Sequence, residues 1–324
     1  MEILEEKESK NNKYKFKIMS YNVRYCNDKL RNNVDGAILT RVKYVTKNIL
    51  LYMPDTIGFQ EVTISENPKK VTWNSLLKEG LKDYYIGVGL GRDHNEISEA
   101  TPIFYNKNKF ELLEQGTKWL SPEPDKPGSQ FDEPRDGLRR VLTYVILKNK
   151  VSSIIYLHVN THLDYRFNEN RIRQIKVVIN FIKKYNDKFP VILTGDFNCG
   201  NTKCEIEKGD AVPYLLSNGF IDAAFEAKDT FHNWTFPSIG YNQNNYNTCL
   251  NRKMHINGKI LDEQKDCVAE CDEENGSIID YCFRSNNKIC FSKYKVITDV
   301  EACGGISSDH YPIYIEGYFV NLNK

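Results

Sequence analysis

The stretch from residue 154 to 198, IIYLHVNTHLDYRFNENRIRQIKVVINFIKKYNDKFPVILTGDFN, decides the fold class of this chain. Two apolar runs rich in β-branched and aromatic residues, one ending near Asp164 and one starting at Val191, have the composition of strands. Between them, isoleucines recur every three or four residues from Ile172 to Ile182, which is the spacing of one helix face. The stretch therefore predicts a strand, a helix and a second strand.

The rest of the chain repeats this composition. Strand-like apolar runs occupy residues 16–23, 55–62, 84–90, 101–106, 142–149, 278–283 and 310–320, and Val42, Val45 and Ile49 mark a second helix. Because the helices fall between more numerous strands, we expect an α/β fold with two packed sheets and helices outside. We expect a flexible tail at residues 1–15, a single domain at 16–324, and an inserted polar loop at about 238–277.

The composition excludes several classes of protein. The 324 residues include 44 basic and 43 acidic side chains, a formal net charge of +1. The chain is therefore neither a highly charged disordered protein nor a strongly basic protein that coats nucleic acid. No run approaches the roughly 18 apolar residues of a membrane span, and the start of the chain lacks the pattern of a signal peptide. We expect a cytoplasmic protein whose nine cysteines are mostly reduced thiols.

Polar and charged side chains gather at the ends of the predicted strands. Asp196 and Asn198 point to one face, because side chains alternate along a strand. An unpaired carboxylate is costly to bury in a core, so we expect these strand ends to meet at a cleft. The set comprises Asn22, Glu61, His162, Asp196, Asn198 and Asp280 after apolar runs, and Asp309 and His310 before one.

Six motifs carry these residues in a fixed order: NVR at 22–24, QEV at 60–62, NTHLD at 160–164, GDFN at 195–198, IDY at 279–281 and SDH at 308–310. Together they resemble the endonuclease/exonuclease/phosphatase superfamily, which has the deoxyribonuclease-I-like fold. GRD, GTKWLSP and DTFHNWTF are similar to stretches in a large, mostly uncharacterised bacterial-type branch of it. The resemblance implies a four-layered α/β/β/α sandwich, with two mixed β-sheets packed face to face.

The resemblance also implies a divalent-metal-dependent phosphoesterase. Glu61 is the expected first metal ligand, with Asn22 supplying a neutral oxygen and Asp309 a second carboxylate. We expect Mg²⁺, or Mn²⁺ as the alternative, because these ions prefer oxygen ligands. Asp196 matches the position that orients or deprotonates the attacking water, and Asn198 would hold that water or a phosphate oxygen.

Two acid–histidine pairs around one phosphate follow from the same resemblance. His310 would donate a hydrogen bond or a proton to the phosphate, while Asp280 holds its other ring nitrogen. Glu99, which precedes the strand at 101–106, would pair with His162. We therefore expect both histidine rings at one cleft.

Arg140 matches an arginine expected to clamp the phosphate, with the neighbouring Arg139 as the alternative. Because one scaffold serves nucleases, deadenylases, inositol phosphatases and sphingomyelinases, the fold does not fix the substrate. We favour a phosphodiester, nucleic acid or nucleotide-like, over a small phosphomonoester. A catalytically silent member that binds nucleic acid or a protein is the third reading, and a monomer is the favoured state.

Overall fold

The computed structural model of the chain describes residues 15–25, 38–200, 209–232, 234–236, 255–256, 259–260, 277–298 and 307–320. The predicted strand–helix–strand stretch forms β9 (Ile155–His162), α4 (Asn168–Lys183) and β10 (Val191–Asp196), and the two strands pair in parallel. They are the centre of a six-stranded sheet. Its order is β11 (Ile221–Asp222), β15 (Asp280–Arg284), β10, β9, β8 (Val141–Asn149) and β7 (Phe110–Trp119).

A seven-stranded sheet contains both ends of the described chain. Its central strands β1 (Lys15–Asn22) and β2 (Thr56–Gln60) are parallel and are joined through α2 (Ile38–Tyr52), while β17 (Ile313–Phe319) pairs antiparallel with β1. The full order is β12 (Asp229–Phe231), β16 (Ile289–Val296), β17, β1, β2, β6 (Ile103–Asn106) and β4 (Tyr85–Val88). Both sheets mix parallel and antiparallel pairs, as expected.

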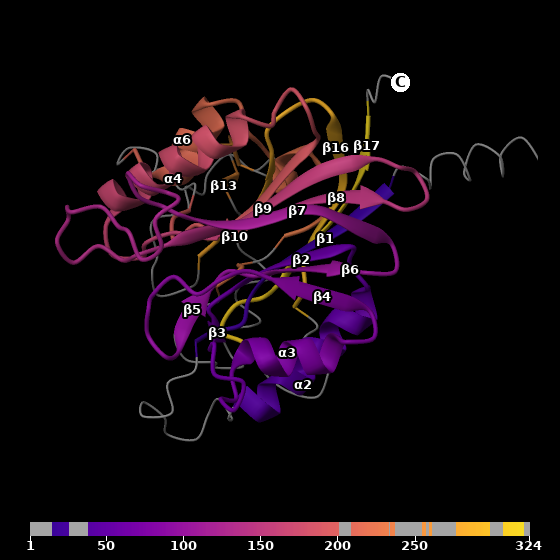
Figure 1. Cartoon of the computed structure of the whole chain (residues 1–324). Helices are drawn as coiled ribbons and strands as arrows, with labels where there is room; N and C mark the ends of the chain where they lie inside the picture. The colour runs from indigo at the N-terminus through magenta and orange to yellow at the C-terminus, as the bar shows by residue number, and fades with distance from the viewer. Residues whose placement is uncertain are drawn as a thin grey trace, which may run out of the picture.

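The two sheets pack face to face with helices outside, which confirms the predicted sandwich (Figure 1). In Figure 1, α2 and α3 (Trp73–Leu81) cover one side, and α4 and α6 (Ala211–Ser217) cover the other. The sheets approach closely at Gly58 of β2, where an added Cβ would lie 2.4 Å from the Thr194 hydroxyl of β10. Glycine is required there because no side chain fits between the sheets.

A buried asparagine on β9 joins the sheets next to the predicted site. The Asn160 amide nitrogen donates to the Phe59 carbonyl at 2.7 Å, and its oxygen accepts from the Gln60 side chain at 2.8 Å. Asn160 and Gln60 are both fully buried, and hydrogen bonds between buried polar groups help to fix one arrangement of a core. The residue that follows Gln60 is Glu61, so the network also fixes the end of β2 that carries it.

Two long strands were not predicted from the sequence. β7 lies at the edge of its sheet, and most of its residues are exposed or half-buried, so FELLEQGTKW lacks an apolar run. β16 reads ICFSKYKV, where polar residues interrupt the apolar positions. The shorter elements are α7 (Ala223–Glu226) and the strand pairs β3 (Val62–Ile64) with β5 (Ser98–Ala100) and β13 (His255–Ile256) with β14 (Lys259–Ile260).

The expected tail at 1–15 and the expected insertion at 238–277 lie almost wholly outside the described residues, so the division of the chain into domains stays a prediction. Within the described ranges, no helix is long and apolar enough to cross a membrane. Cys282 and Cys290 are free thiols.

Candidate active site

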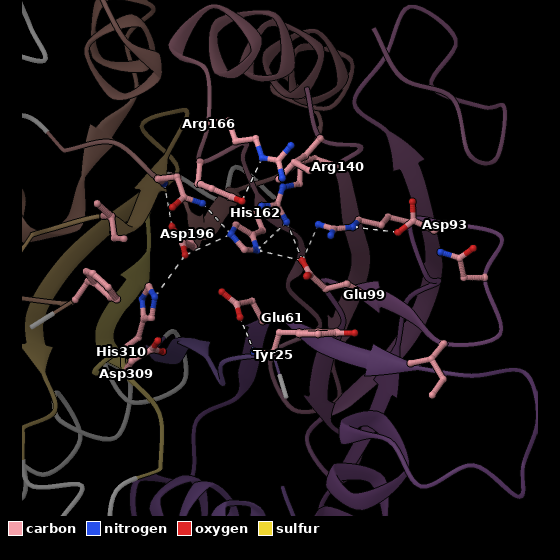
Figure 2. A pocket seen from close by; sticks show the side chains of 18 residues that line it. Tyr25, Glu61, Asp93, Glu99, Arg140, His162, Arg166, Asp196, Asp309 and His310 are labelled. Atoms are coloured by element: carbon pink, nitrogen blue, oxygen red, sulfur yellow. Dashed lines mark hydrogen bonds and ion pairs between the residues drawn. The ribbon is translucent and has the colours of Figure 1, made fainter. Parts of the chain in front are cut away.

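The register of three neighbouring strands builds the centre of the site. Asp196 ends β10 and lies opposite His162 of the parallel strand β9 and opposite Asp280 of the antiparallel strand β15. β1 of the other sheet ends beside them with Asn22. Glu61, which directly follows β2, faces the same cleft (Figure 2). The strand ends therefore meet at one cleft, as the sequence predicts.

Asn22 connects the two carboxylates from the two sheets. Its amide nitrogen donates to Asp196 Oδ2 at 2.9 Å and to Glu61 Oε1 at 3.0 Å, and its oxygen accepts from the backbone N–H of Arg24 at 2.8 Å. The nitrogen rather than the oxygen thus faces the carboxylates. The role of Asn22 as an oxygen ligand to a metal stays a prediction.

Strained backbone supports Glu61 and Asn198. Their φ angles are +60° and +49°, in the left-handed region that residues other than glycine rarely adopt. Arg24, at the edge of the cleft, has a φ of +59°. The backbone N–H of Tyr25 donates to Glu61 Oε2, and that of Asn198 donates to Asp196 Oδ1 at 2.9 Å. Strain of this kind persists where the surroundings fix a functional geometry.

His310 forms the expected pair with Asp280. Its Nδ1 lies 2.9 Å from Asp280 Oδ2, and its Nε2 lies 3.8 Å from Asp196 Oδ2. Burial alone would lower the pKa of His310, but the charge and hydrogen bond of Asp280 raise it to about 10. His310 is therefore an imidazolium at neutral pH, with Nε2–H directed into the cleft.

His162 has the opposite protonation state. Its Nε2 lies 2.8 Å from the side-chain nitrogen of Asn198, which also donates to the Leu163 carbonyl at 3.0 Å. Burial and the charge of Arg140 lower the pKa of His162, against the raising effect of Glu99. Its Nδ1 lies 3.5 Å from Glu99 Oε1 and 3.3 Å from Arg140 Nη1.

Glu99 binds two arginines more closely than it binds the histidine. Its Oε1 accepts from Arg92 and from Arg140, each at 2.8 Å. Burial would raise the pKa of Glu99, but the charges of Arg140 and Arg92 and the contact with His162 hold it well below its usual range. Arg140 is buried and lines the cleft, whereas Arg139 turns to Asp93 at 3.1 Å.

A divalent cation fits the acidic centre of the cleft. Candidate ligand atoms of Glu61, Asp196 and His310 lie within 4.8 Å of one another, and the two carboxylates can bind a cation while His310 is protonated. Burial and the charges of Glu99 and Asp309 raise the pKa of Glu61. Carboxylate oxygens are the ligands that hard divalent cations prefer. The Asp309 carboxylate lines the same cleft but pairs with Arg24 at 3.3 Å.

The cleft has a volume of about 630 Å³ and extends beyond the predicted residues. Sequence reasoning missed the side chains of Tyr25, Arg92, Tyr165, Arg166 and Phe236, which also line it. Four of these residues could have been found in the sequence by their position in or beside a motif. Tyr25 directly follows NVR, Arg92 lies in GRD, and Tyr165 and Arg166 directly follow NTHLD.

Comparisons with known proteins agree with this geometry. The structure is similar to an endonuclease/exonuclease/phosphatase from Bacteroides vulgatus, at 24% identity and a TM-score of 0.71, covering 94% of this chain and 99% of that one. It is also similar to a mannosyl-6-phosphatase from Bacteroides thetaiotaomicron, at 23% identity and a TM-score of 0.69, covering 94% and 100%. These similarities show the shared fold.

A curated relative is the 3'-5'-exoribonuclease subunit Ccr4 of the CCR4-Not complex from Mycosarcoma maydis, 23% identical over 193 residues. The match covers 54% of this chain and 28% of Ccr4, so the chain spans less than a third of the length of that relative. The model of the Endonuclease/Exonuclease/phosphatase family matches residues 19–310, most of the chain. The chain therefore belongs to the endonuclease/exonuclease/phosphatase family.

Proposed function

We propose that this protein is a Mg²⁺-dependent phosphodiesterase that acts on nucleic acid or a nucleotide-like diester. The observation that carries the proposal is the convergence of Glu61, Asp196 and His310 within 4.8 Å in an open cleft, beside Asn198 and His162. A phosphodiester needs its negative charge compensated and a water activated for attack. This constellation offers groups suited to both tasks.

We propose Glu61, Asp309 and Asn22 as the residues that hold the metal. When bound, Mg²⁺ would offset the negative charge of the phosphoryl oxygens and of the leaving oxygen. Mn²⁺ prefers the same ligands and is the alternative.

Asp196 is the proposed general base. Burial and the neighbouring charge of Asp280 raise its pKa to about 6, against the lowering effect of His310. A carboxylate with this pKa is still largely ionised at neutral pH and accepts a proton from water more readily than an ordinary aspartate. The Asn198 amide, fixed by the Leu163 carbonyl, would hold the water or a phosphate oxygen.

The cationic side chains complete the proposed mechanism. His310 would donate a hydrogen bond from Nε2 to a phosphoryl oxygen, with Asp280 holding the ring. Arg140 would balance the substrate charge, although it is also bound by Glu99. His162, bonded to Asn198, would orient that amide, and this role differs from direct phosphate contact.

We favour a diester substrate because of two tyrosines that line the cleft and because of the curated relative Ccr4. Two exposed tyrosines, Tyr25 and Tyr165, line the cleft and leave room for groups on both ester oxygens of a substrate. Ccr4 is named as an exoribonuclease. A small phosphomonoester remains the runner-up, because the fold also serves a mannosyl-6-phosphatase. The cytoplasmic location and the monomeric state stay predictions.

A substrate panel tests the proposal. Purified protein is assayed with Mg²⁺ and with a chelator against plasmid DNA, single-stranded RNA, nucleotide phosphates, inositol phosphates and sphingomyelin, with Asp196→Asn as the blank. We expect chelator-sensitive cleavage of a nucleic-acid or nucleotide diester. Turnover of phosphomonoesters alone would reject the diester, and full activity in chelator would reject the metal. A protein that binds nucleic acid but turns over nothing would be a silent member of the family.

A further inference from the structure

The arginines around the cleft differ in how their charges are compensated. Four have carboxylate partners: Arg24 pairs with Asp309, Arg92 and Arg139 with Asp93, and Arg140 with Glu99. Arg166 lines the same cleft, but none of its contacts with the described residues is an ion pair. Its positive charge is therefore available to an anion that enters the cleft.

The contacts of Arg166 orient its guanidinium without neutralising it. Its Nε donates to the Tyr165 hydroxyl at 3.1 Å, and its Nη1 donates to the backbone carbonyl of Asp136 at 3.2 Å. The guanidinium centre also lies 5.4 Å from the centroid of the Tyr165 ring. An arginine held in this way loses little side-chain freedom when it binds an oxyanion.

Tyr165 places an aromatic surface beside this charge. The residue is 58% exposed and lines the cleft. The segment that carries it is fixed to the catalytic centre, because Asn198 donates to the Leu163 carbonyl two residues earlier. In Figure 2, Arg166 and Tyr25 lie on opposite sides of Glu61 and His162, so Arg166 is on one flank of the acidic centre. Tyr165 directly precedes Arg166 in the chain.

We propose that Tyr165 and Arg166 form a subsite for the nucleotide next to the scissile phosphate. Arg166 binds the flanking phosphate, and Tyr165 stacks on the base of the nucleotide to which that phosphate belongs. A positive charge beside an exposed aromatic ring is the combination that binds single-stranded nucleic acid without reading its sequence. This inference rests on the proposed phosphodiesterase function and narrows its substrate to a strand of at least two phosphates.

The test compares two substrates in each variant. Bis(4-nitrophenyl) phosphate has one phosphate, with no flanking phosphate and no nucleobase, whereas a single-stranded trinucleotide has a flanking phosphate and bases. The readout is the ratio of kcat/KM for the trinucleotide to kcat/KM for the small diester. Arg135→Gln is the matched control, because Arg135 is an exposed arginine on the neighbouring loop and does not line the cleft.

We expect Arg166→Gln to lower this ratio about tenfold or more, the effect of losing one charge-assisted hydrogen bond. Arg135→Gln should leave the ratio at the wild-type value, and Arg166→Lys should recover part of it. Tyr165→Ala should lower the ratio about fivefold or more, since stacking on one base has this order of magnitude. Added salt should shrink the effect of Arg166→Gln, because the contact is electrostatic.

An equal ratio in Arg166→Gln and Arg135→Gln would overturn the subsite. If this equal ratio came with an equal loss of kcat/KM on both substrates in Arg166→Gln, Arg166 would contact the scissile phosphate instead. Failure of the proposed function looks different, since the wild-type protein would then cleave neither diester.

Discussion

At the scale of single residues, the site separates the pKa values of groups that lie a few ångströms apart. Asp280 raises the pKa of His310 to about 10, whereas burial and Arg140 lower the pKa of His162. Asp196 lies between them with a pKa of about 6. Neighbouring groups with diverging pKa values are typical of acid–base catalysis, so the protonation states alone assign different tasks to the two histidines.

Asp196→Asn tests the proposed base. The amide keeps the size of the side chain and can still accept one of the two hydrogen bonds that Asn22 and Asn198 donate, but it cannot accept a proton from water. We expect kcat on the preferred diester to fall by a factor on the order of 10²–10⁴, with an unchanged circular dichroism spectrum. Asp187→Asn, at an exposed position, is the control. A loss below tenfold would show that Asp196 is not the base.

Arg41 is a positioning residue that the sequence did not single out. Its Nη1 donates to the carbonyls of Val23 at 2.6 Å and Ser307 at 3.1 Å, and it lies 4.9 Å from the centroid of the Trp73 ring. The side chain thus ties the segment after β1 to the segment that carries Asp309 and His310.

Arg41→Met should lower both stability and activity. Buried carbonyls that lose a charged donor cost about 1.5–3 kcal/mol each, so we expect lower stability together with at least a tenfold loss in kcat. Arg284→Met is the matched control. Arg284 is a partly buried arginine that binds Glu226 at a distance of 2.7 Å, and it does not line the cleft. The unfolding free energy of Arg284→Met should also fall, while the kcat of this control stays at the wild-type value. Equal kcat values in the two variants would remove Arg41 from the site.

At the scale of elements, the short helix α7 has a pH-sensitive cap. The carboxylate of Asp222 accepts from the Ala224 backbone N–H at 2.9 Å, and burial raises the Asp222 pKa to about 7. The native state therefore holds a proton that the unfolded chain releases near pH 4. Stability from this group is fully present below about pH 4, is lost as the pH rises, and is gone above about pH 7.

Asp222→Asn should remove that pH dependence. Asparagine is also a good N-cap residue, and it stays neutral at every pH. The loss of unfolding free energy between pH 5 and pH 8 should be greater in the wild-type protein than in the variant, with an upper limit of about 2.7 kcal/mol. Urea unfolding at the two pH values measures the loss of unfolding free energy, and Asp187→Asn, at an exposed position, is the control. Parallel pH profiles would exclude Asp222 as the titrating group.

The elements also explain what the sequence could and could not predict. Strand ends such as those of β9 and β10 were predictable, because an apolar run that stops at a carboxylate or an imidazole leaves few places for that group. The strand β7 was not predictable, since an edge strand needs no apolar face. The pairing of Arg139 with Asp93, 46 residues away, depends on how two loops meet, and no local pattern records that contact. For the same reason, Arg166 could not be recognised as the arginine without an ion pair.

At the scale of the whole molecule, the catalytic cleft is a source of electrostatic repulsion that folding must overcome. Glu61, Asp196 and Asp309 come from segments distant in sequence and are brought together at the end of the sandwich. Burial and the charges of Glu99 and Asp309 raise the pKa of Glu61, which shows the cost of holding it ionised. A bound divalent cation would offset that cost and should therefore stabilise the entire fold, because it binds only the native state.

Thermal unfolding with and without Mg²⁺ tests this coupling without any substrate. At a free concentration about 100 times Kd, a ligand of the native state adds about 2.7 kcal/mol, so we expect the Tm of the wild-type protein to rise by about 5 °C. Glu61→Gln should abolish the rise, and its Tm without Mg²⁺ should equal or exceed that of the wild type because a repelled charge is gone. Glu111→Gln, an exposed position on β7, should keep the full rise. The same Mg²⁺-dependent rise in Glu61→Gln and in the wild type would place the cation elsewhere and remove Glu61 from the proposed metal ligands.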